Sequence, residues 1–558
     1  MRKISRNPLA RMLQRVHAAH IEAERTGKDS SDILAKDKEV QAQLHQQSTE
    51  QSERRKFLQQ AGLAAGAVAA TSATPAMANV INNGNRPNKK QPKIVIIGAG
   101  AAGVRAAHRL RQYNIDADLY EGSERLGGRM YSSSTAFDGR VIEWGGELVS
   151  TEHTALRNLC NTLSIGLEDV NKLPDGMEET YLINGKLYNE HDLDREWQGG
   201  LYELFKRDQQ AAPWQPTWDI NTAAHQKFDW MSTEQYLNDA GLSSNHWAHQ
   251  LMMTNVVSEY GLKDDCPALN LIYTLGWTNR GSGGLPLAGT DERFHIVGGN
   301  NAVIQKMADQ IGHDHIHTGK KLVAVSGEAQ GPYSLTFEDG SVVNCDRLVM
   351  ALPTWKNRDV EWDPRILAGM HPKRVEALQN IAGGDNGKIH VEFNSKIFNQ
   401  TQTINGKEVH QSAVSYSDPD EFVTTWEGNP ASDSEKGILV NYTGGVRGKN
   451  LGGSEYFGTA GSQDVNRVLN DFEQIWPGAQ NAFTGNAIVS NWYDYPLVGG
   501  SFTSPRIGHY TSWWGALFED EGNLMFAGEG TDRETWGFME GGIISGERVA
   551  NFIAQTNK

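Results

Sequence analysis

The sequence has very little cysteine and no long hydrophobic run. Its three cysteines, Cys160, Cys266 and Cys345, stand far apart among 558 residues, which argues against a disulfide framework or a cysteine zinc site. No apolar stretch is suited to a stable transmembrane helix, and there is no internal repeat or nucleic-acid motif. Acidic residues outnumber basic ones by 68 to 52, and the net charge of −16 disfavours nucleic acid or anionic lipid as a partner.

Glycine, by contrast, is abundant. The 59 glycines are typical of a chain with many tight turns and close contacts between its backbone and a ligand. The length exceeds that of one ordinary domain, so two closely joined domains are expected. The histidines at 313–317 alternate as metal ligands on a strand would, but we expect a solvated turn there and no metal site.

The first ninety residues differ in composition from the rest. Residues 1–50 are polar without a strong apolar repeat, so we expect a disordered extension. At 51–78, Arg54 and Arg55 precede an Ala/Gly-rich stretch that closes on small residues, which resembles a twin-arginine signal peptide. Residues 79–91 would be a linker. The alternative is a disordered basic tail with a chance pair of arginines.

A signal of this type has consequences for partners and location. Twin-arginine export carries folded proteins, so a bound redox cofactor becomes more plausible for this chain. We expect the twin-arginine export machinery as a partner, a periplasmic or secreted location, and no stable membrane insertion.

A dinucleotide-binding motif begins at residue 94. The β-branched run at 94–97 predicts a buried parallel strand, which leads through a glycine-rich turn into a helix at 104–113. A second strand at 118–120 ends on an acid, at the offset where ribose hydroxyls are bound. The glycines permit a tight turn, close approach of a diphosphate and close packing of the helix. The residues expected to contact the dinucleotide are Gly98, Gly100, Ala101, Ala102, Gly103 and Glu121.

Segments at both ends of the chain indicate FAD rather than a nicotinamide cofactor. A second glycine turn at 125–129 and an acidic glycine motif at 143–147 follow where nicotinamide domains normally continue with another βαβ unit. Near the C-terminus, a strand at 524–529 and a glycine turn at 537–542 precede a helix whose N-terminus would face the flavin. These segments assign Gly127, Gly128, Arg129, Gly145, Gly146, Glu147, Gly528, Glu529, Gly537, Phe538 and Met539 to cofactor binding.

Together these motifs resemble the flavin amine oxidase family, which includes monoamine oxidases, polyamine oxidases and L-amino-acid oxidases. The resemblance runs from residue 93 to the C-terminus and adds Leu322 and Trp492 as cofactor contacts. It implies an α/β fold in which a Rossmann-type FAD-binding domain is interleaved with an α+β substrate domain. The FAD-binding domain would comprise 92–150, 293–360 and 490–558, and the substrate domain 151–292 and 361–489.

The resemblance also implies catalytic roles for three residues. Lys388 matches the lysine that in this family holds a water against flavin N5. Phe502 and Phe538 match the two walls of the family's aromatic cage, which clamps and orients an amine. Ser501 stands where some monoamine oxidases carry the cysteine bonded to the flavin, so a non-covalent FAD is expected.

The activity that the resemblance implies is FAD-dependent oxidation of a small-molecule amine. A primary or secondary amine (monoamine, diamine or polyamine) would lose hydride to flavin N5, and the imine would hydrolyse to an aldehyde plus ammonia or amine. Oxygen, giving hydrogen peroxide, or another acceptor would reoxidise the flavin. L-Amino-acid oxidases usually place an arginine after this glycine turn to bind the substrate carboxylate, whereas this chain has Glu147. Glu147 would repel a carboxylate and could hold a distal ammonium group, which favours amines over amino acids.

Three other readings stay open. An L-amino-acid oxidase remains possible because Arg157 or Arg280 could bind a carboxylate. A flavin desaturase or porphyrinogen-type oxidase shares the glycine motifs but lacks the lysine and the paired cage. A non-catalytic FAD-binding protein would bind the flavin without turning over amines.

Overall fold

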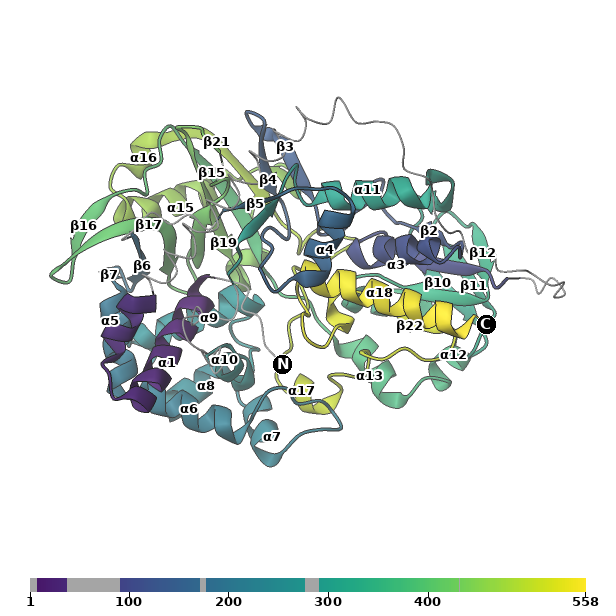
Figure 1. The fold of residues 1–558 in the computed structure, drawn as a ribbon, viewed down its shortest axis with the longest axis horizontal. Helices are drawn as coiled ribbons and strands as arrows, with labels where there is room; N and C mark the ends of the chain where they lie inside the picture. The colour runs from purple at the N-terminus through teal and green to yellow at the C-terminus, as the bar shows by residue number, and fades with distance from the viewer. Residues whose placement is uncertain (1–7, 38–90, 171–176, 276–290, 431, 558) are drawn as a thin grey trace, which may run out of the picture.

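The computed structural model describes residues 8–37, 91–170, 177–275, 291–430 and 432–557, and these form two adjoining lobes (Figure 1). The lobe on the right of Figure 1 is built around a parallel sheet and is called the Rossmann lobe below. The lobe on the left contains a large mixed sheet over a group of helices and is called the mixed-sheet lobe. The predicted fold class, an α/β amine-oxidase-like fold, is confirmed.

The Rossmann lobe has a five-stranded parallel sheet at its centre, in the order β22-β13-β1-β2-β9. Every residue of β1, at the centre of the sheet, and of β22, at one edge, is buried, as expected for parallel strands covered on both faces. The strands come from three distant parts of the chain. They are β1 (Ile94–Ile97), β2 (Asp118–Tyr120), β9 (Ile316–His317), β13 (Arg347–Met350) and β22 (Leu524–Phe526).

Helices pack closely on this sheet because glycines remove side chains at the contacts. A Cβ atom on Gly103 of α3 would lie 1.9 Å from the Gly98 carbonyl oxygen, and one on Gly546 of α18 would lie 2.4 Å from the Ala102 carbonyl oxygen. Neither contact is sterically possible, so α3 can sit on its turn, and α18 on α3, only with glycine at these positions. The helices are α3 (Ala101–Gln112), α4 (Thr154–Thr162), α11 (Asn301–Ile311) and α18 (Met539–Thr556).

Smaller elements complete the Rossmann lobe. A four-stranded sheet in the order β12-β11-β10-β14 flanks the parallel sheet, and the short pairs β3–β4 and β5–β8 connect toward the other lobe. Their bounds are β3 (Ser132–Phe137), β4 (Arg140–Glu143), β5 (Leu167–Asp169), β8 (Phe294–Ile296), β10 (Leu322–Gly327), β11 (Tyr333–Phe337), β12 (Val342–Cys345), β14 (Glu361–Trp362), α12 (Pro364–Ala368), α13 (Pro372–Asn380) and α17 (His509–Ser512).

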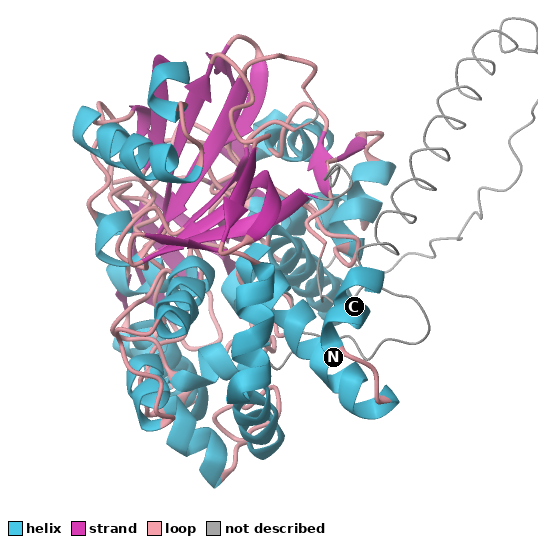
Figure 2. Ribbon diagram, turned by 90° about the vertical axis from the view of Figure 1, so that its left-hand side faces the viewer, coloured by secondary structure: helices cyan, strands magenta, loops and turns pink. Residues whose placement is uncertain are grey.

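The mixed-sheet lobe is organised by a nine-stranded sheet, seen above a layer of helices in Figure 2. Strand β15 (Gly387–Phe393) is buried along its whole length between β19 and β21, so its side chains are held on both faces. The other strands are β6 (Met177–Ile183), β7 (Lys186–Tyr188), β16 (Thr401–Ile404), β17 (Lys407–Ser417), β18 (Thr424–Glu427), β19 (Gly437–Thr443), β20 (Phe457–Thr459) and β21 (Phe483–Ser490).

Helices cover both faces of the mixed sheet. On one face, the amphipathic α15 (Ser462–Ile475) buries Val465, Val468, Leu469 and Phe472, spaced as one face of a helix. On the other face, α9 (Trp247–Tyr260) is buried almost all round. The remaining helices are α5 (Glu190–Glu196), α6 (Tyr202–Ala211), α7 (Ala223–Asp229), α8 (Thr233–Asp239), α10 (Ala268–Leu275), α14 (Gly445–Lys449) and α16 (Ala479–Ala482).

The N-terminal helix α1 (Pro8–Thr26) corrects one prediction. Residues 1–50 were expected to be disordered, and this is wrong for the described residues 8–37. Leu9, Met12, Leu13 and Val16 are almost fully buried in the core, and Figure 1 shows α1 among the helices of the mixed-sheet lobe. Their spacing is that of one face of a helix, a local pattern that a polar average composition conceals. The predicted signal (51–78) and most of the linker (79–91) lie outside the described residues.

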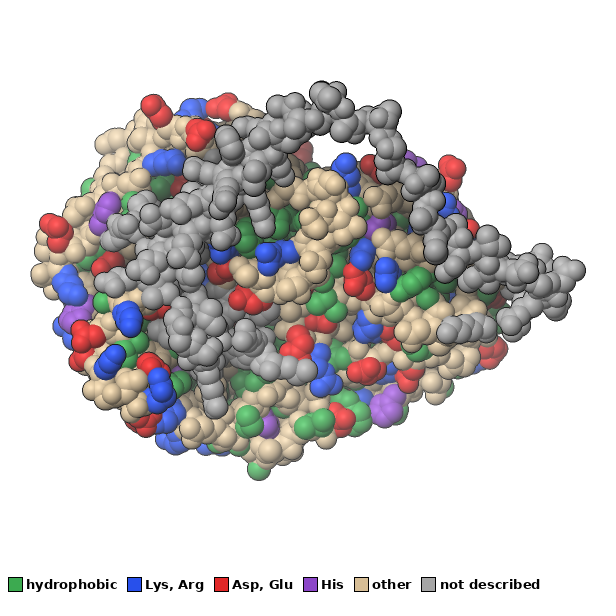
Figure 3. Space-filling view, viewed as in Figure 1, with side chains coloured by type: hydrophobic (Ala, Val, Ile, Leu, Met, Phe, Trp, Pro, Cys, Tyr) green, Lys and Arg blue, Asp and Glu red, His purple; other side chains and the backbone are tan. Residues whose placement is uncertain are grey.

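Two surface properties bear on partners. No helix within the described residues combines the length and apolar character needed to cross a membrane. On the face shown in Figure 3, lysine and arginine side chains are interspersed with aspartate and glutamate rather than gathered into a basic surface.

Candidate active site

A cavity of about 370 Å³ begins at the turn between β1 and α3. Gly98 adopts φ +100°, and a Cβ atom there would lie 2.7 Å from the Ala351 carbonyl oxygen, so the turn requires glycine. A Cβ atom on Gly100 would meet no protein atom within 4 Å, because this residue faces the cavity. Gly100 is also the N-cap of α3 and offers no side-chain cap, which leaves the helix N-terminus available to a phosphate.

Glu121 lies at the end of β2 on the wall of this cavity. Its carboxylate accepts hydrogen bonds from the Ala99 N–H at 2.8 Å and from the Ser123 N–H and hydroxyl, both at 2.8 Å. These bonds hold the carboxylate next to the glycine turn, where an acid binds ribose hydroxyls. The glycine cradle, the free helix N-terminus and the placed carboxylate therefore fit a bound dinucleotide.

Most residues assigned to cofactor binding line this cavity, and four do not. Gly103 lies behind the turn, where it allows α3 to pack against Gly98. Gly145, Glu147 and Trp492 line a second cavity instead. Those that line the first cavity are Gly98, Gly100, Ala101, Ala102, Glu121, Gly127, Gly128, Arg129, Gly146, Leu322, Gly528, Glu529, Gly537, Phe538 and Met539.

Arg129 and Glu529 join the chain segments that meet at the inner end of the first cavity. The Arg129 guanidinium donates to Glu529 at 2.9 Å and to the Ser501 carbonyl oxygen at 2.8 Å. The Glu529 carboxylate also accepts from the Gly537 N–H at 2.7 Å, just ahead of α18. One ion pair thus ties the second glycine turn to the C-terminal strand and helix.

The second cavity, of about 410 Å³, lies between the two lobes and meets the first one. Phe502 and Phe538, the predicted cage residues, line both cavities at their junction. Phe538 immediately precedes α18, and its ring centroid lies 5.1 Å from that of His153. The Ser501 hydroxyl donates to the Asn386 amide oxygen at 2.9 Å. The predicted cage therefore stands where the two cavities open into each other.

Lys388, at the start of β15, lies in the second cavity and is buried. Its ammonium group donates to Glu147 at 2.6 Å, to the Gly145 carbonyl oxygen at 2.8 Å and to the Glu143 carbonyl oxygen at 3.3 Å. The other Glu147 oxygen accepts from the Trp426 indole at 3.1 Å. Burial acts to raise the pKa of Glu147, but Lys388 above all outweighs it and holds that pKa below its ordinary value.

This ion pair changes the interpretation of Glu147. The sequence suggested that Glu147 repels a substrate carboxylate and holds a distal ammonium group, which would require an uncompensated charge. Because Lys388 and Trp426 already engage both of its oxygens, Glu147 carries no such free charge. Glu147 therefore gives no support to the expected preference for amines over amino acids, which stays a prediction.

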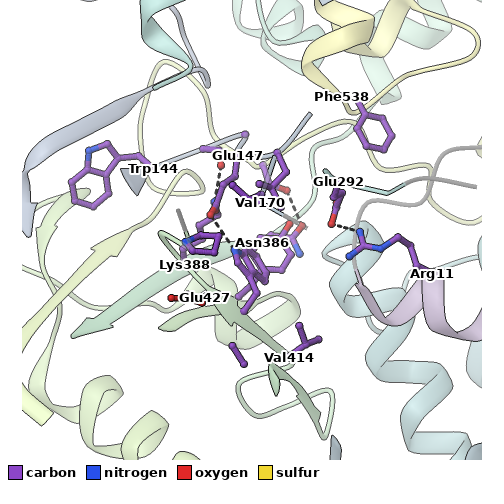
Figure 4. A pocket seen from close by; sticks show the side chains of 18 of the residues that line it. Arg11, Trp144, Glu147, Val170, Glu292, Asn386, Lys388, Val414, Glu427 and Phe538 are labelled. Carbon is purple, nitrogen blue, oxygen red and sulfur yellow. Dashed lines mark hydrogen bonds and ion pairs between the residues drawn. The ribbon is translucent and has the colours of Figure 1, made fainter. Parts of the chain in front are cut away.

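The second cavity also contains charged residues that the sequence analysis missed. Arg11 of α1 forms an ion pair with Glu292, and both side chains line the cavity (Figure 4). Glu179 of β6 lies in the same lining and accepts a hydrogen bond from the Tyr416 hydroxyl at 2.9 Å. Burial raises the pKa of Glu179 to about 7. The helical spacing of apolar residues around Arg11 is the signal that would have revealed it.

Arg157 and Arg280 are the two arginines that the sequence offers as ligands for the carboxylate of an amino-acid substrate. The Arg157 guanidinium donates to the Thr151 carbonyl oxygen at 2.6 Å and lies 5.0 Å from the Phe294 ring centroid. Arg157 is not among the residues that line the second cavity. Arg280 lies outside the described residues. Within the described part of the chain, no group of residues suits a metal ion. His315 instead pairs with Asp118 at 3.2 Å.

Comparisons with known proteins agree with this architecture. The family model described as "Flavin containing amine oxidoreductase" matches residues 101–554. Lysine-specific histone demethylase 1 homolog 2 of Oryza sativa subsp. japonica is 22% identical over 500 residues, 85% of this chain but only 58% of that protein. Pseudooxynicotine dehydrogenase of Pseudomonas sp is 24% identical over 528 residues, 90% of this chain and 95% of that protein. The solved structure of cyclohexylamine oxidase from Brevibacterium oxydans IH-35A has the same fold, with a TM-score of 0.69, 18% identity and coverage of 84% of this chain and 99% of that one.

Proposed function

The chain belongs to the flavin-containing amine oxidoreductase family, and we propose that it oxidises small primary or secondary amines with a non-covalently bound FAD. The observation that carries this proposal is the meeting of two cavities at Phe502 and Phe538. One cavity has a dinucleotide cradle, and the other contains the Lys388–Glu147 pair. Family membership makes the chain a flavin-dependent amine oxidase or dehydrogenase; the substrate and the residue roles below are proposals.

The chain's own residues would hold the cofactor along the first cavity. The N-terminus of α3 would bind the diphosphate and Glu121 the ribose, while the N-terminus of α18 would support negative charge at the flavin ring. Bound FAD would supply the acceptor at N5 for a hydride from the α-carbon of the amine, and the imine would hydrolyse to an aldehyde plus ammonia or amine. Oxygen, giving hydrogen peroxide, or another acceptor would take the electrons.

Phe502 and Phe538 would bind and orient the reacting amine. Their phenyl rings offer apolar and cation–π contact without a hydroxyl group that could hydrogen-bond to the substrate. A substrate held between two rings loses rotational freedom before the reaction, and this orientation increases the rate of the chemical step. Ser501 offers a hydroxyl, not a thiol, so no thioether to the flavin can form there.

Lys388 would hold a water molecule near the reacting atoms. Its ammonium group has three N–H donors, and three protein acceptors already engage them. The bond to the Glu143 carbonyl oxygen, at 3.3 Å, is the longest and the one that a water can replace at least cost. The short bond to Glu147 would then keep the lysine side chain in place.

Anaerobic titration of the purified yellow protein tests the proposal directly. Monoamines, diamines, polyamines and L-amino acids are added without oxygen, and bleaching of the flavin absorbance band is followed. We expect bleaching by amines and a rate that rises from pH 6 to 9, because the reacting amine must be unprotonated. Bleaching by L-amino acids alone would identify an L-amino-acid oxidase. A flavin that binds but bleaches with none would identify a non-catalytic FAD-binding protein.

We also propose that the chain is exported through a twin-arginine pathway to the periplasm or medium. The support is the sequence at 51–78, which lies outside the described residues. Replacing Arg54 and Arg55 with lysine should retain the folded, FAD-loaded protein in the cytoplasm, as measured by cell fractionation. Equal export of the variant and the parent chain would refute the proposal.

A further inference from the structure

Helix α1 forms part of the wall of the second cavity, where the proposed substrate would bind. Its Arg11 side chain lines the cavity and pairs with Glu292. Figure 4 shows the two side chains pointing toward each other, on the opposite side of the view from Lys388 and Trp144. A residue near the N-terminus thus contributes charge to the end of the cavity away from the Lys388–Glu147 pair.

The position of Arg11 is set by a packed helix rather than by a loop. Ala10 and Met12, on either side of it, are buried in the core. One turn further along, the Gln14 amide donates to the Thr274 carbonyl oxygen at 2.6 Å, and the Arg15 guanidinium pairs with Asp37 at 3.0 Å. The first contact ties α1 to α10 and the second ties it to the segment that follows α1, so the Arg11 guanidinium is held at the cavity wall.

Carboxylates surround the Arg11 guanidinium. Glu292 pairs with it directly, and Glu179 lines the same end of the cavity. Burial raises the pKa of Glu292 and that of Glu179 although Arg11 acts to lower both. Arg15, which already pairs with Asp37, also acts to lower the pKa of Glu179, so the two arginines compensate these part-buried carboxylates only in part. A further cation would be stabilised there, and a further anion would have to displace Glu292 from Arg11.

We propose that Arg11 is a specificity-determining residue: Glu292 and Glu179 favour amines whose distal end carries a second cationic group, and the charge of Arg11 limits that preference. The proposal rests on the proposed function, because the reacting end of the amine must lie at Phe502 and Phe538. Since α1 supplies this residue, the segment ahead of the twin-arginine-like motif belongs to the working enzyme.

Three linear substrates of equal length test the role of Arg11: pentylamine, 1,5-diaminopentane and 5-aminopentanoate, whose distal ends are neutral, cationic and anionic. The variants are Arg11→Met and Glu292→Gln, with Arg11→Lys as the charge-conserving control. We expect kcat/KM for the diamine relative to pentylamine to rise about 10-fold in R11M and to fall about 10-fold in E292Q. The aminopentanoate ratio should move the opposite way, R11K should resemble the parent chain, and the changes should lie in KM rather than kcat.

The outcomes separate this proposal from the proposed function. Equal changes for all three substrates, or unchanged ratios, would show that Arg11 is only structural and would overturn the proposal. If none of the three bleaches the flavin of the parent protein, the assigned substrate class is wrong, whereas amine oxidation itself is decided by the wider panel. If R11M fails to fold, E292Q and R11K still give the comparison.

The inference that α1 belongs to the working enzyme can be tested without an activity assay. The full chain with a C-terminal tag is expressed in a bacterium that has the twin-arginine pathway, and the FAD-loaded fraction is purified and analysed by intact mass spectrometry. We expect every FAD-loaded molecule to contain residues 8–37, either joined to the body or as a co-eluting peptide. An FAD-loaded, folded enzyme without that peptide would refute the inference.

Discussion

Replacing Lys388 with methionine should destabilise the protein mainly through Glu147. The two side chains are 6% and 7% exposed and 2.6 Å apart, so solvent screens the pair little. Methionine keeps most of the side-chain volume but leaves the Glu147 carboxylate buried without its cation. Removing one member of a buried ion pair typically costs about 3–5 kcal/mol, and we expect a loss of that size at pH 8.

The sign of the pH dependence follows from the pKa of Glu147. Against the effect of burial, Lys388 holds this pKa below its ordinary value, so the pair stabilises the parent protein at pH values above about 4.5. In Lys388→Met, burial acts without the lysine and the pKa of Glu147 rises. The variant should therefore lose stability relative to the parent as the pH increases from 5 to 8.

A double variant separates the structural role of Lys388 from its catalytic one. Lys388→Met/Glu147→Gln removes both charges and should regain most of the lost stability, to within about 1 kcal/mol of the parent, while amine oxidation stays slow. Equilibrium urea unfolding at equal, saturating FAD measures the stabilities, since bound ligand shifts the midpoint. A loss below about 1 kcal/mol in the single variant at pH 8, or a double variant as unstable as the single one, would refute this reasoning.

Three further predictions concern stability and cofactor binding. Leu13→Ala should cost about 2–5 kcal/mol in urea unfolding, because Leu13 is fully buried; a cost as small as that of the exposed Ile220→Ala would show that α1 contributes little. Burial raises the pKa of Glu143 to about 8, so Glu143 should oppose folding increasingly from pH 4.5 to 8. Glu143→Gln should flatten the fall in melting temperature over that range, and an unchanged slope would contradict the assignment. Gly103→Ala should lower both FAD content and apoprotein stability, because its Cβ would lie 1.9 Å from the Gly98 oxygen, whereas Gly100→Ala should lower only FAD affinity. Equal stability losses in the two apoproteins would refute this distinction.

The dinucleotide cradle could be read from the sequence because its determinants are local. The strand, the glycine turn, α3 and Glu121 lie within about thirty consecutive residues, and each glycine has a steric reason to be there. The two C-terminal motifs could likewise be read one by one. That they meet Arg129 through Glu529 depends on contacts between segments 400 residues apart.

Other details of the site depend on long-range partners that the sequence does not reveal. Glu147 was interpreted as a free acid because its partners, Lys388 and Trp426, are 241 and 279 residues away. Gly145 and Trp492, two predicted cofactor contacts, line the second cavity at some distance in sequence from each other, and their role in cofactor binding stays a prediction. Helix α1 is a different case, because its apolar period is visible in the sequence but was outweighed by its polar average.

By itself, the sequence determined the α/β class, the family resemblance and the glycine positions, because strand period, turn sterics and helix starts are properties of neighbouring residues. Only the tertiary structure decided which charged side chains pair with one another in the second cavity. Arg11 and Glu292 are 281 residues apart, and no periodicity links such positions. Their pairing exists because the fold brings both side chains, largely shielded from solvent, to one cavity wall, where an isolated charge would be costly.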